Sequence, residues 1–502
     1  MRRQLQRAER DKEALRRQNE RLQRQLDESQ KQIGDRDKAI ADKDKALAEK
    51  EKQIADLERQ LAARRKNSTN SSKPPSSDGL AGDQRPRNKP KKSRRKPGGQ
   101  TGHDGSHRPL VEPERVDEVI AILPAECKHC GHGLPQHTEG IQTIGDVHRH
   151  QVIELPPIQA HITEYQCPKV LCQECGKGTR APLPSEFQHQ SGPQLTALIA
   201  YLTVVCRMPR RVVEALLEDA LHISMSLGST QKAWEQASTA VQTSYQELQQ
   251  QLKNEPVLNS DETSWRNDGE KRWIWALVAQ GFVFYTVAAN RSSEVLIHLL
   301  GAVFRGVLCS DRAAAYVKYH KGKAQFCWAH LKRNLLGILD FAKTTEADRF
   351  CRDALALHAR LFRLWHRFRG DHPHRPELIR KSLPLQKKFF ELADRHVNSD
   401  DPEVRNLARA LFLHCDRLFT FLEEPGVEPT NNSAERALRI AVQWRKVSFG
   451  NRSANGELAT ARLLTATQTC KIQQCSAIDY LTQAVRCYRR GLPAPSLLTQ
   501  QK

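Results

Sequence analysis

Apolar residues recur at every seventh position in the N-terminal part of the chain. This row consists of Leu26, Ile33, Ile40, Leu47, Ile54 and Leu61. A seven-residue period causes helices to supercoil around one another, and Asn19 on the same row favours a dimer of fixed register. We therefore predict a coiled coil over residues 1–66 that holds the chain in a homodimer or a larger assembly. A single charged helix stabilised by Glu–Lys pairs is the alternative.

Residues 67–110 lack any such pattern and are rich in Ser, Pro, Gly, Lys and Arg. This composition cannot bury an apolar core, so we predict a disordered basic linker. Eight of the twelve residues from Arg85 to Lys96 are basic. Arg94, Arg95 and Lys96 are therefore candidates for contacts with DNA phosphates, and a solvated tail without a specific role is the alternative.

The next two segments differ in their periodicity. Within residues 111–188, stretches such as Gln151–Tyr165 alternate apolar and polar residues, which predicts a small β-rich module. Residues 189–252 have helical periodicity and a Gly-containing turn before a third helix, which we expect to begin at Ser229 or Thr230. This pattern is typical of a helix-turn-helix DNA-binding segment, although a plain helical bundle would look the same.

A mixed α/β sheet is predicted for residues 253–455. The expected strands cover residues 256–261, 272–279, 282–289, 306–311 and 324–328. The first three follow one another as in a meander, and a helix near residues 294–304 provides a crossover to the fourth. Residues 331–422 have an entirely helical pattern, which indicates an all-α insertion at about 340–424. Residues 456–502 form a predicted C-terminal helical segment.

Charge and composition narrow the class of partner. The 79 Lys and Arg residues exceed the 58 Asp and Glu residues, and the net charge of +21 suits nucleic acid. The longest mostly apolar stretch, Ala197–Cys206, is too short to cross a bilayer, so no membrane partner is expected. The charged N-terminus lacks the apolar part of a secretion signal, which favours a cytoplasmic protein.

Two Cys-x-x-Cys pairs indicate a metal site. Most of the 13 cysteines should be reduced in the cytoplasm, so clustered cysteines are candidates for metal binding. Cys127 with Cys130, and Cys172 with Cys175, supply the four thiolates of a closed, structural Zn²⁺ site. Substitution of one ligand by Cys167, His129 or His132 remains open.

Three acidic residues lie where a nucleotidyl transferase of the ribonuclease-H type needs them. Asp261 ends the first predicted strand, Asp311 ends the fourth, and Glu435 opens a later helix. Carboxylates from separate elements can hold two Mg²⁺ ions for phosphodiester chemistry. Spacing alone does not distinguish these residues from Glu262, Asp268 and Glu457. Glu262 follows Asp261 on a strand and should therefore face the opposite side.

Several longer motifs support this interpretation. They are NSSKPPSSD from Asn70, GGQTGHDG from Gly98, the paired CxxC, DETSW from Asp261, SDRAAAY from Ser310, CWAHLKRN from Cys327, NNSAERALR from Asn431 and WRKVSFGN from Trp444. In this order, the chain resembles the insertion sequence sixty-six family of bacterial transposases over nearly its whole length. The resemblance implies a leucine zipper, a zinc-binding domain, a DDE transposase domain and a short C-terminal segment.

The resemblance also implies roles for individual residues. Asp261, Asp311 and Glu435 would bind two Mg²⁺ or Mn²⁺ ions in a ribonuclease-H-like core of residues 253–455. The cations expected to contact DNA in or beside the motifs are His330, Lys332, Arg333, Arg436, Arg439, Arg445 and Lys446. The expected activity is metal-dependent cleavage and strand transfer at the terminal inverted repeats of an insertion sequence, helped by accessory proteins of the same element.

Two other classes of protein fit part of these features. A non-catalytic DNA-binding regulator explains the charge, the coiled coil and the cysteine pairs, but it does not need the three separated acids. A Holliday-junction or RNA-directed nuclease on the same scaffold would use the acids but would cleave without specificity for element ends.

Overall fold

The computed structural model describes residues 2–65, 109–137, 139, 142, 144–368 and 375–498. Nearly all of the predicted linker, including Arg94, Arg95 and Lys96, lies outside this part of the chain. The residues from 109 onward belong to two compact units. One contains Thr243–Cys475, and the other contains residues 109–242 together with Ser476–Pro495. Each unit is described by itself below.

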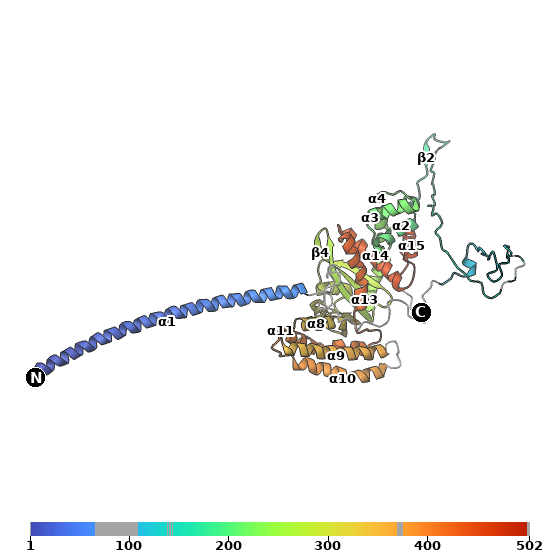
Figure 1. Ribbon diagram of the computed structural model, residues 1–502. Coiled ribbons are helices and arrows are strands. Elements are labelled where there is room, and N and C mark those ends of the chain that lie inside the picture. The colour runs from blue at the N-terminus through green and yellow to red at the C-terminus, as the bar shows by residue number, and fades with distance from the viewer. Residues whose placement is uncertain are drawn as a thin grey trace. The chain divides into compact units, whose positions relative to one another are not determined.

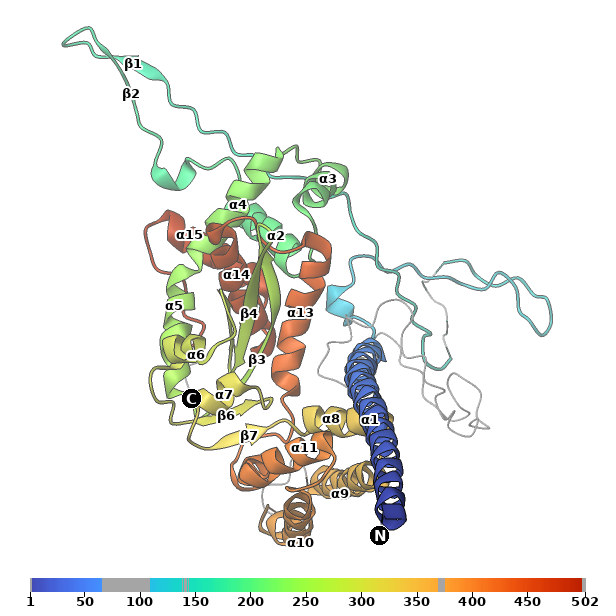
Figure 2. The same ribbon diagram turned by 90° about the vertical axis from the view of Figure 1, so that its left-hand side faces the viewer.

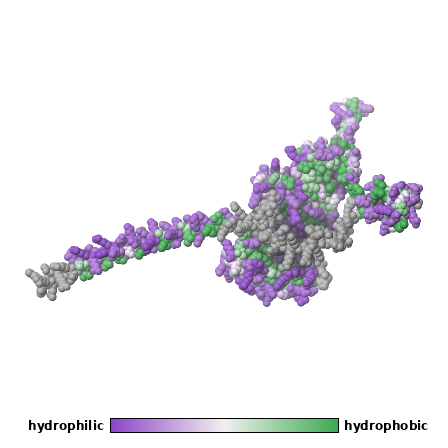
Figure 3. All heavy atoms as spheres, viewed as in Figure 1, coloured by the Kyte–Doolittle hydropathy of each residue, from purple (hydrophilic) through white to green (hydrophobic). Residues whose placement is uncertain are grey.

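The N-terminal heptads form one continuous helix, α1 (Arg2–Arg65). Among the described residues, its regularly spaced apolar side chains are not covered by another part of the chain, and Ile33, Ile40 and Ile54 are each 56% exposed. Figure 3 shows a mainly hydrophilic helix surface with hydrophobic residues interspersed along it. The prediction of a helix is confirmed, and the coiled coil remains a prediction.

The cysteine-containing segment has less β structure than the sequence indicates. Its described residues contain two antiparallel strands of three residues each, β1 (Lys169–Leu171) and β2 (Gly178–Arg180). Two 3-10 turns, η2 (Pro113–Arg115) and η3 (Ser185–Phe187), flank this region. The strand predicted for Gln151–Tyr165 is wrong, because these residues form no regular structure. Pro156 and Pro157 lack the N–H groups that a ladder needs, and no neighbouring strand pairs with this stretch.

A bundle of four short helices follows in the same unit. It consists of α2 (Pro193–Val204), α3 (Arg210–Leu221), α4 (Leu227–Ala240) and, from the end of the chain, α15 (Ala477–Arg489). The start predicted for the third helix at Ser229 or Thr230 is wrong, because α4 begins at Leu227. The hydroxyl of Ser226 caps it by accepting a hydrogen bond from the Ser229 N–H, and Gly228 therefore lies inside the helix.

Helix α15 belongs to this bundle. Leu481, Ala484 and Val485 are fully buried, and the Arg489 guanidinium donates hydrogen bonds to Gln236 Oε1 at 2.7 Å and to Ser191 O at 2.8 Å. The predicted C-terminal segment 456–502 is therefore divided between the two units.

The other unit is built on a five-stranded mixed sheet with the order β5-β4-β3-β6-β7. Its strands are β3 (Val257–Asn267), β4 (Glu270–Val278), β5 (Val283–Ala288), β6 (Val307–Ser310) and β7 (Ala324–Phe326). The first three form the predicted antiparallel meander, and β6 and β7 add in parallel. Helix α6 (Ser293–Leu300) precedes β6 as expected, and α7 (Ala314–Tyr319) connects β6 to β7.

Helices cover this sheet and one of its edges (Figure 2). α5 (Gln242–Gln251) and the 3-10 turn η4 (Leu252–Asn254) lead into β3, and α13 (Asn432–Ser448) packs against β3 and β4. α14 (Ala454–Ile472) lies against the outermost strand, β5. Its Thr465 hydroxyl accepts a hydrogen bond from the Tyr285 N–H at 2.9 Å, and the Thr469 hydroxyl accepts one from the Val283 N–H at 3.2 Å. These side chains satisfy donors that an open sheet edge would leave unpaired.

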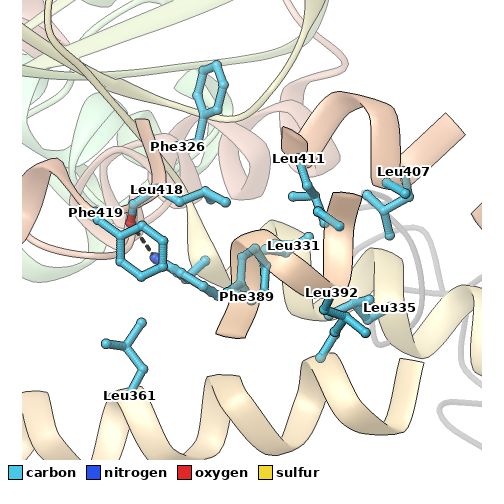
Figure 4. Packing of buried hydrophobic residues seen from close by; sticks show 14 of the residues in the cluster. Phe326, Leu331, Leu335, Leu361, Phe389, Leu392, Leu407, Leu411, Leu418 and Phe419 are labelled. Carbon is cyan, nitrogen blue, oxygen red and sulfur yellow. Dashed lines mark hydrogen bonds between the residues drawn. The ribbon is translucent and has the colours of Figure 1, made fainter. Parts of the chain in front are cut away.

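The predicted all-α insertion is confirmed. It contains α8 (Trp328–Asp340), α9 (Thr345–Phe368), α10 (Arg375–Arg395), α11 (Pro402–Leu413), η6 (Asp416–Leu418) and α12 (Thr420–Glu423). α9 and α10 lie side by side (Figure 1). Phe389 and Phe419 pack edge-on against Trp328, whose indole N–H donates to Leu418 O at 2.6 Å. Figure 4 shows Phe389, Leu418 and Phe419 in the buried cluster to which they belong. Trp328 thereby anchors the start of α8 in the core of the insertion.

None of the described helices is both long and apolar enough to cross a lipid bilayer.

Candidate functional site

The structure brings Asp261 and Asp311 to neighbouring strands. β3 pairs in parallel with β6 through Val257 opposite Val307 and Asn259 opposite Cys309. Continuing this register places Asp261 opposite Asp311, which directly follows β6. Asp261 does not end its strand as predicted, because β3 continues to Asn267 in a long hairpin with β4. Asp261 instead lies beside the point where β6 ends.

Glu435 approaches the two aspartates from α13. It lies in the first turn of this helix, as predicted. Asn431 secures the helix start, because its side-chain amide donates to Ser260 O at 2.8 Å and its backbone N–H donates to Cys327 Sγ at 3.1 Å. The start of α13 is thus tied to β3 and to the residue that precedes α8.

The three acids influence one another electrostatically. Burial raises the pKa of Asp261 well above its usual range, and the negative charges of Glu262, Asp311 and Glu435 raise it further. Burial also raises the pKa of Asp311, although Arg291, Arg312 and Arg333 oppose this effect. Carboxylates that raise the pKa of a neighbour are close enough to repel it, and a cation bound among them would remove this repulsion.

Glu262, the nearest rival, faces the opposite side of the sheet, as expected. The register places Asp261 opposite Ala276 and Glu262 opposite Trp275 on β4. Tyr316 of α7 donates its hydroxyl proton to Glu262 Oε2 at 2.5 Å. Burial raises the pKa of Glu262 to about 7 even though this hydrogen bond lowers it.

The other two rivals have structural positions away from the three acids. Asp268 occupies the turn between β3 and β4 with a φ of 49°. Glu457 lies 3.4 Å from Arg272, a residue of the same hairpin.

Helix α8 presents basic residues to Glu435. The Arg333 guanidinium donates to Glu435 Oε1 at 2.7 Å, and His330 Nδ1 lies 3.5 Å from the same oxygen. Burial, together with the charges of Arg333 and Arg312, lowers the pKa of His330 to about 3. This lowered pKa favours the neutral imidazole, and the contact of His330 with DNA remains a prediction.

The remaining basic residues differ in their surroundings. Lys332, Arg436, Arg439 and Lys446 are exposed, and their contacts with DNA remain predictions. Arg445 is half-buried and donates hydrogen bonds to the backbone oxygen and the hydroxyl of Ser264. Its guanidinium is thus engaged within the protein, where it ties α13 to β3.

The motif that ends with Asn451 connects the end of α13 to β3. Asn451 Oδ1 accepts a hydrogen bond from the Trp265 indole at 2.7 Å, and the Asn451 N–H donates to Arg266 O at 2.9 Å. Gly450 has a φ of 107°, and a Cβ there would lie 2.2 Å from Arg266 O. Only glycine fits this close approach. The sequence did not predict these contacts of Gly450 and Asn451. It also did not predict the hydrogen bonds of Asn431 and Tyr316.

The two cysteine pairs have the same local geometry. The Gly131 N–H donates to Cys127 O, and the Gly176 N–H donates to Cys172 O, each at 2.9 Å. Backbone N–H groups that follow Cys127 and Cys172 lower the pKa of both thiols, which favours the thiolates that zinc requires. Among the described residues, however, the four sulfur atoms do not gather into one cluster. A shared ion would have to bring the two pairs together.

Comparisons with known proteins identify the family. Residues 188–458 match the model described as "Transposase IS66 family", and residues 1–109 match a family of unknown function, DUF6444. The uncharacterized proteins y4qI and y4hP of Sinorhizobium fredii (strain NBRC 101917 / NGR234) are 25% and 22% identical to the chain. These alignments cover 76% and 75% of the chain and 74% and 73% of the two relatives. Because the transposase model spans more than half of the 502 residues, including Asp261, Asp311 and Glu435, the chain belongs to the IS66 family of transposases.

Proposed function

We propose that this transposase cleaves DNA at the terminal inverted repeats of its insertion sequence and joins the exposed 3′-hydroxyls to target DNA. Asp261, Asp311 and Glu435 are the proposed ligands of two Mg²⁺ or Mn²⁺ ions. The observation that carries the proposal is the parallel register of β3 and β6, which leads Asp261 and Asp311 to neighbouring positions. Burial and the charges of Glu262, Asp311 and Glu435 raise the pKa of Asp261, in agreement with this placement. Oxygen donors from separate elements suit these ions.

The chain's own residues supply the positioning. β3 pairs with β6 in the register that leads to the two aspartates, and Asn431 ties the start of α13, which carries Glu435, to Ser260 of β3. When bound, a pair of divalent ions activates the attacking oxygen and stabilises the leaving oxygen of a phosphodiester. The exposed cations Lys332, Arg436 and Arg439 are proposed to bind the DNA phosphates.

The test is strand transfer on DNA that carries the element ends, with Mg²⁺ present. Asp261→Asn, Asp311→Asn and Glu435→Gln should each lower the rate on the order of a thousandfold while DNA binding persists. Asp268→Asn is the matched control, because asparagine tolerates the positive φ of this turn. Full activity of Asp261→Asn or Glu435→Gln contradicts the assignment. DNA binding by the unmodified chain without metal-dependent nicking would favour a regulator instead, and cleavage without end specificity would favour a junction nuclease.

The N-terminal parts are proposed to organise the complex. Cys127, Cys130, Cys172 and Cys175 would share a structural Zn²⁺ ion, and α1 would join two copies of the chain. Residues 67–110 and the helices α2 to α4 would add DNA contacts, and small proteins of the same element would assist.

A further inference from the structure

A second group of potential metal ligands lies next to the proposed catalytic acids. The ligand atoms of Cys327, His330 and Glu435 all lie within 4.8 Å of one another. Cys327 directly precedes α8, His330 lies one turn later on this helix, and Glu435 reaches them from α13. Among the described residues, these three already lie close enough together to share one metal ion, whereas the ligand atoms of Asp261, Asp311 and Glu435 do not all lie this close to one another.

His330 has a free ligand atom that points to an ion. The residue is 8% exposed, and its Nδ1 atom has no hydrogen-bond partner in the described part of the chain. A buried polar atom without a partner is costly, so native structures usually satisfy it. A neutral imidazole with an unpaired, buried Nδ1 offers the lone pair that a metal ligand needs.

Cys327 is placed to become a thiolate when a cation arrives. Its side chain is buried, and the Asn431 N–H donates to Sγ at 3.1 Å. The start of a helix and a backbone N–H donor both stabilise negative charge on sulfur. When a metal ion binds, the Cys327 thiol forms the S–metal bond as a thiolate and releases its proton to solvent.

The donor set determines the class of ion. Sulfur and imidazole nitrogen suit Zn²⁺ and its analogues Co²⁺ and Cd²⁺, whereas Mg²⁺ prefers oxygen. Zinc bonds of about 2.0–2.3 Å in a tetrahedron separate the ligands by roughly 3.3–3.6 Å. The 3.5 Å between His330 Nδ1 and Glu435 Oε1 falls within this range.

We propose that Cys327, His330 and Glu435 form an inhibitory zinc site that withdraws Glu435 from the catalytic magnesium ions. This role of the site rests on the proposed function, because inhibition requires Glu435 to be a catalytic ligand. Three protein ligands leave the fourth tetrahedral position open to water or another small ligand. Zinc bound there also displaces the Arg333 guanidinium from Glu435 Oε1.

The first test counts bound zinc. Equilibrium dialysis of the full-length chain against Zn²⁺, followed by metal analysis, should show one more equivalent in the unmodified protein than in Cys327→Ala or His330→Gln. Cys351→Ala is the matched control, because Cys351 is also a buried free cysteine but lies in the insertion core. Zinc held by the two CxxC pairs is a constant background in all variants.

Cobalt gives a readout that does not depend on activity. The unmodified chain loaded with Co²⁺ should show a stronger thiolate-to-cobalt absorption band than Cys327→Ala, and Cys351→Ala should match the unmodified chain. Equal zinc content and equal absorption in the unmodified chain and Cys327→Ala would overturn the proposal. If Cys327→Ala does not fold, the zinc content of His330→Gln decides in its place.

The second test measures strand transfer with Mg²⁺ and increasing Zn²⁺. The Zn²⁺ concentration that halves each protein's own activity should rise more than about tenfold in Cys327→Ala, as expected when a ligand is lost. An unchanged concentration overturns the inhibitory role even if zinc binds. Activity of Asp261→Asn would contradict the proposed catalytic residues. The zinc site would still be supported if the number of bound zinc ions falls in Cys327→Ala.

Discussion

The Nη2 atom of Arg333 lies 2.7 Å from Oε1 of Glu435 and thus joins α8 to the first turn of α13. Both side chains are largely buried, with exposed fractions of 18% and 31%. A charge-assisted hydrogen bond in these surroundings is stronger than one at the surface. The guanidinium therefore competes with divalent cations for a carboxylate oxygen that the proposed reaction needs.

Removal of this cation should change metal affinity. We expect Arg333→Gln to tighten Mn²⁺ binding about fivefold, equivalent to roughly 1 kcal/mol, because a positive charge beside the site is lost. Isothermal titration calorimetry measures this affinity. Arg436→Gln is the control, since Arg436 is an exposed neighbour of Glu435 on α13. Unchanged or weaker Mn²⁺ binding in Arg333→Gln would show that the two cations do not compete.

Glu262 should make the metal-free protein less stable as the pH rises. Its pKa of about 7 lies above the 4.5 of an unburied glutamate, so the folded state holds the proton more tightly than the unfolded state. Stability contributed by the protonated form is present below pH 4.5 and is lost as the pH rises through about 7, on the order of 3 kcal/mol in total. Urea unfolding between about pH 5 and pH 8 without Mg²⁺ measures the slope.

The variant Glu262→Gln should reduce the dependence of the free energy of unfolding on pH. The dependence that remains comes from Asp261 and Asp311, whose pKa values are also raised. Glu270→Gln, at an exposed acid on the same hairpin, should leave the slope unchanged. An identical slope in Glu262→Gln and in the unmodified protein would rule out this titration.

Substitution of Gly450 by alanine should destabilise the protein more than the same substitution at Gly426. Gly450→Ala is expected to cost more than about 2 kcal/mol, because a methyl group would collide with Arg266 O in a backbone conformation that alanine rarely adopts. Gly426→Ala shares the positive φ but has no atom within 4 Å, so it should cost only about 1 kcal/mol. Thermal unfolding measures the stability of both variants. Equal losses of stability would exclude the collision with Arg266 O as the cause of the effect at Gly450.

The apolar row of α1 should hold two chains together. The double variant Ile33→Asp and Ile40→Asp should be monomeric in light scattering, because charges on the seam prevent burial of the apolar row. Lys38→Asp and Lys45→Asp change the same helix outside the seam and should leave the assembly intact. A monomeric unmodified chain would favour the alternative of a single charged helix.

The cysteine pairs should act as one zinc site. Cys127→Ser and Cys172→Ser should each remove the same single zinc ion, and their combination should remove no more, because both pairs contribute to one tetrahedron. Cys167→Ser should retain the ion. Additive losses in the double variant would instead indicate two separate sites.

Local patterns predicted the elements around the acids well. Three consecutive strand-forming segments indicated β3 to β5 as a meander, and the helical insertion followed from the helical pattern of residues 331–422. The strand end at Asp261 was misplaced because β3 continues to Asn267, past the point where β6 ends. Its outer residues pair with β4 as a hairpin whose turn contains Asp268 and Gly269, both with positive φ.

Other features depend on contacts that no local pattern contains. The lowered pKa of His330 results from burial and from the charges of Arg333 and of Arg312, which lies 18 positions earlier in the chain. The cluster of Cys327 and His330 with Glu435 joins residues more than a hundred positions apart. In Gln151–Tyr165 the local pattern is present but the strand is not. Alternation of apolar and polar residues cannot stabilise a strand when no partner strand is available.

The position of α15 has a consequence for biosynthesis. α2, α3 and α4 come early in the chain, yet their bundle includes Arg489, whose guanidinium binds Ser191 and Gln236. During translation, the sheet and its insertion emerge completely before the ribosome has made the helix that finishes this bundle. A nascent chain can therefore fold its acidic centre while the bundle is still incomplete, and prematurely terminated products would lack a finished bundle.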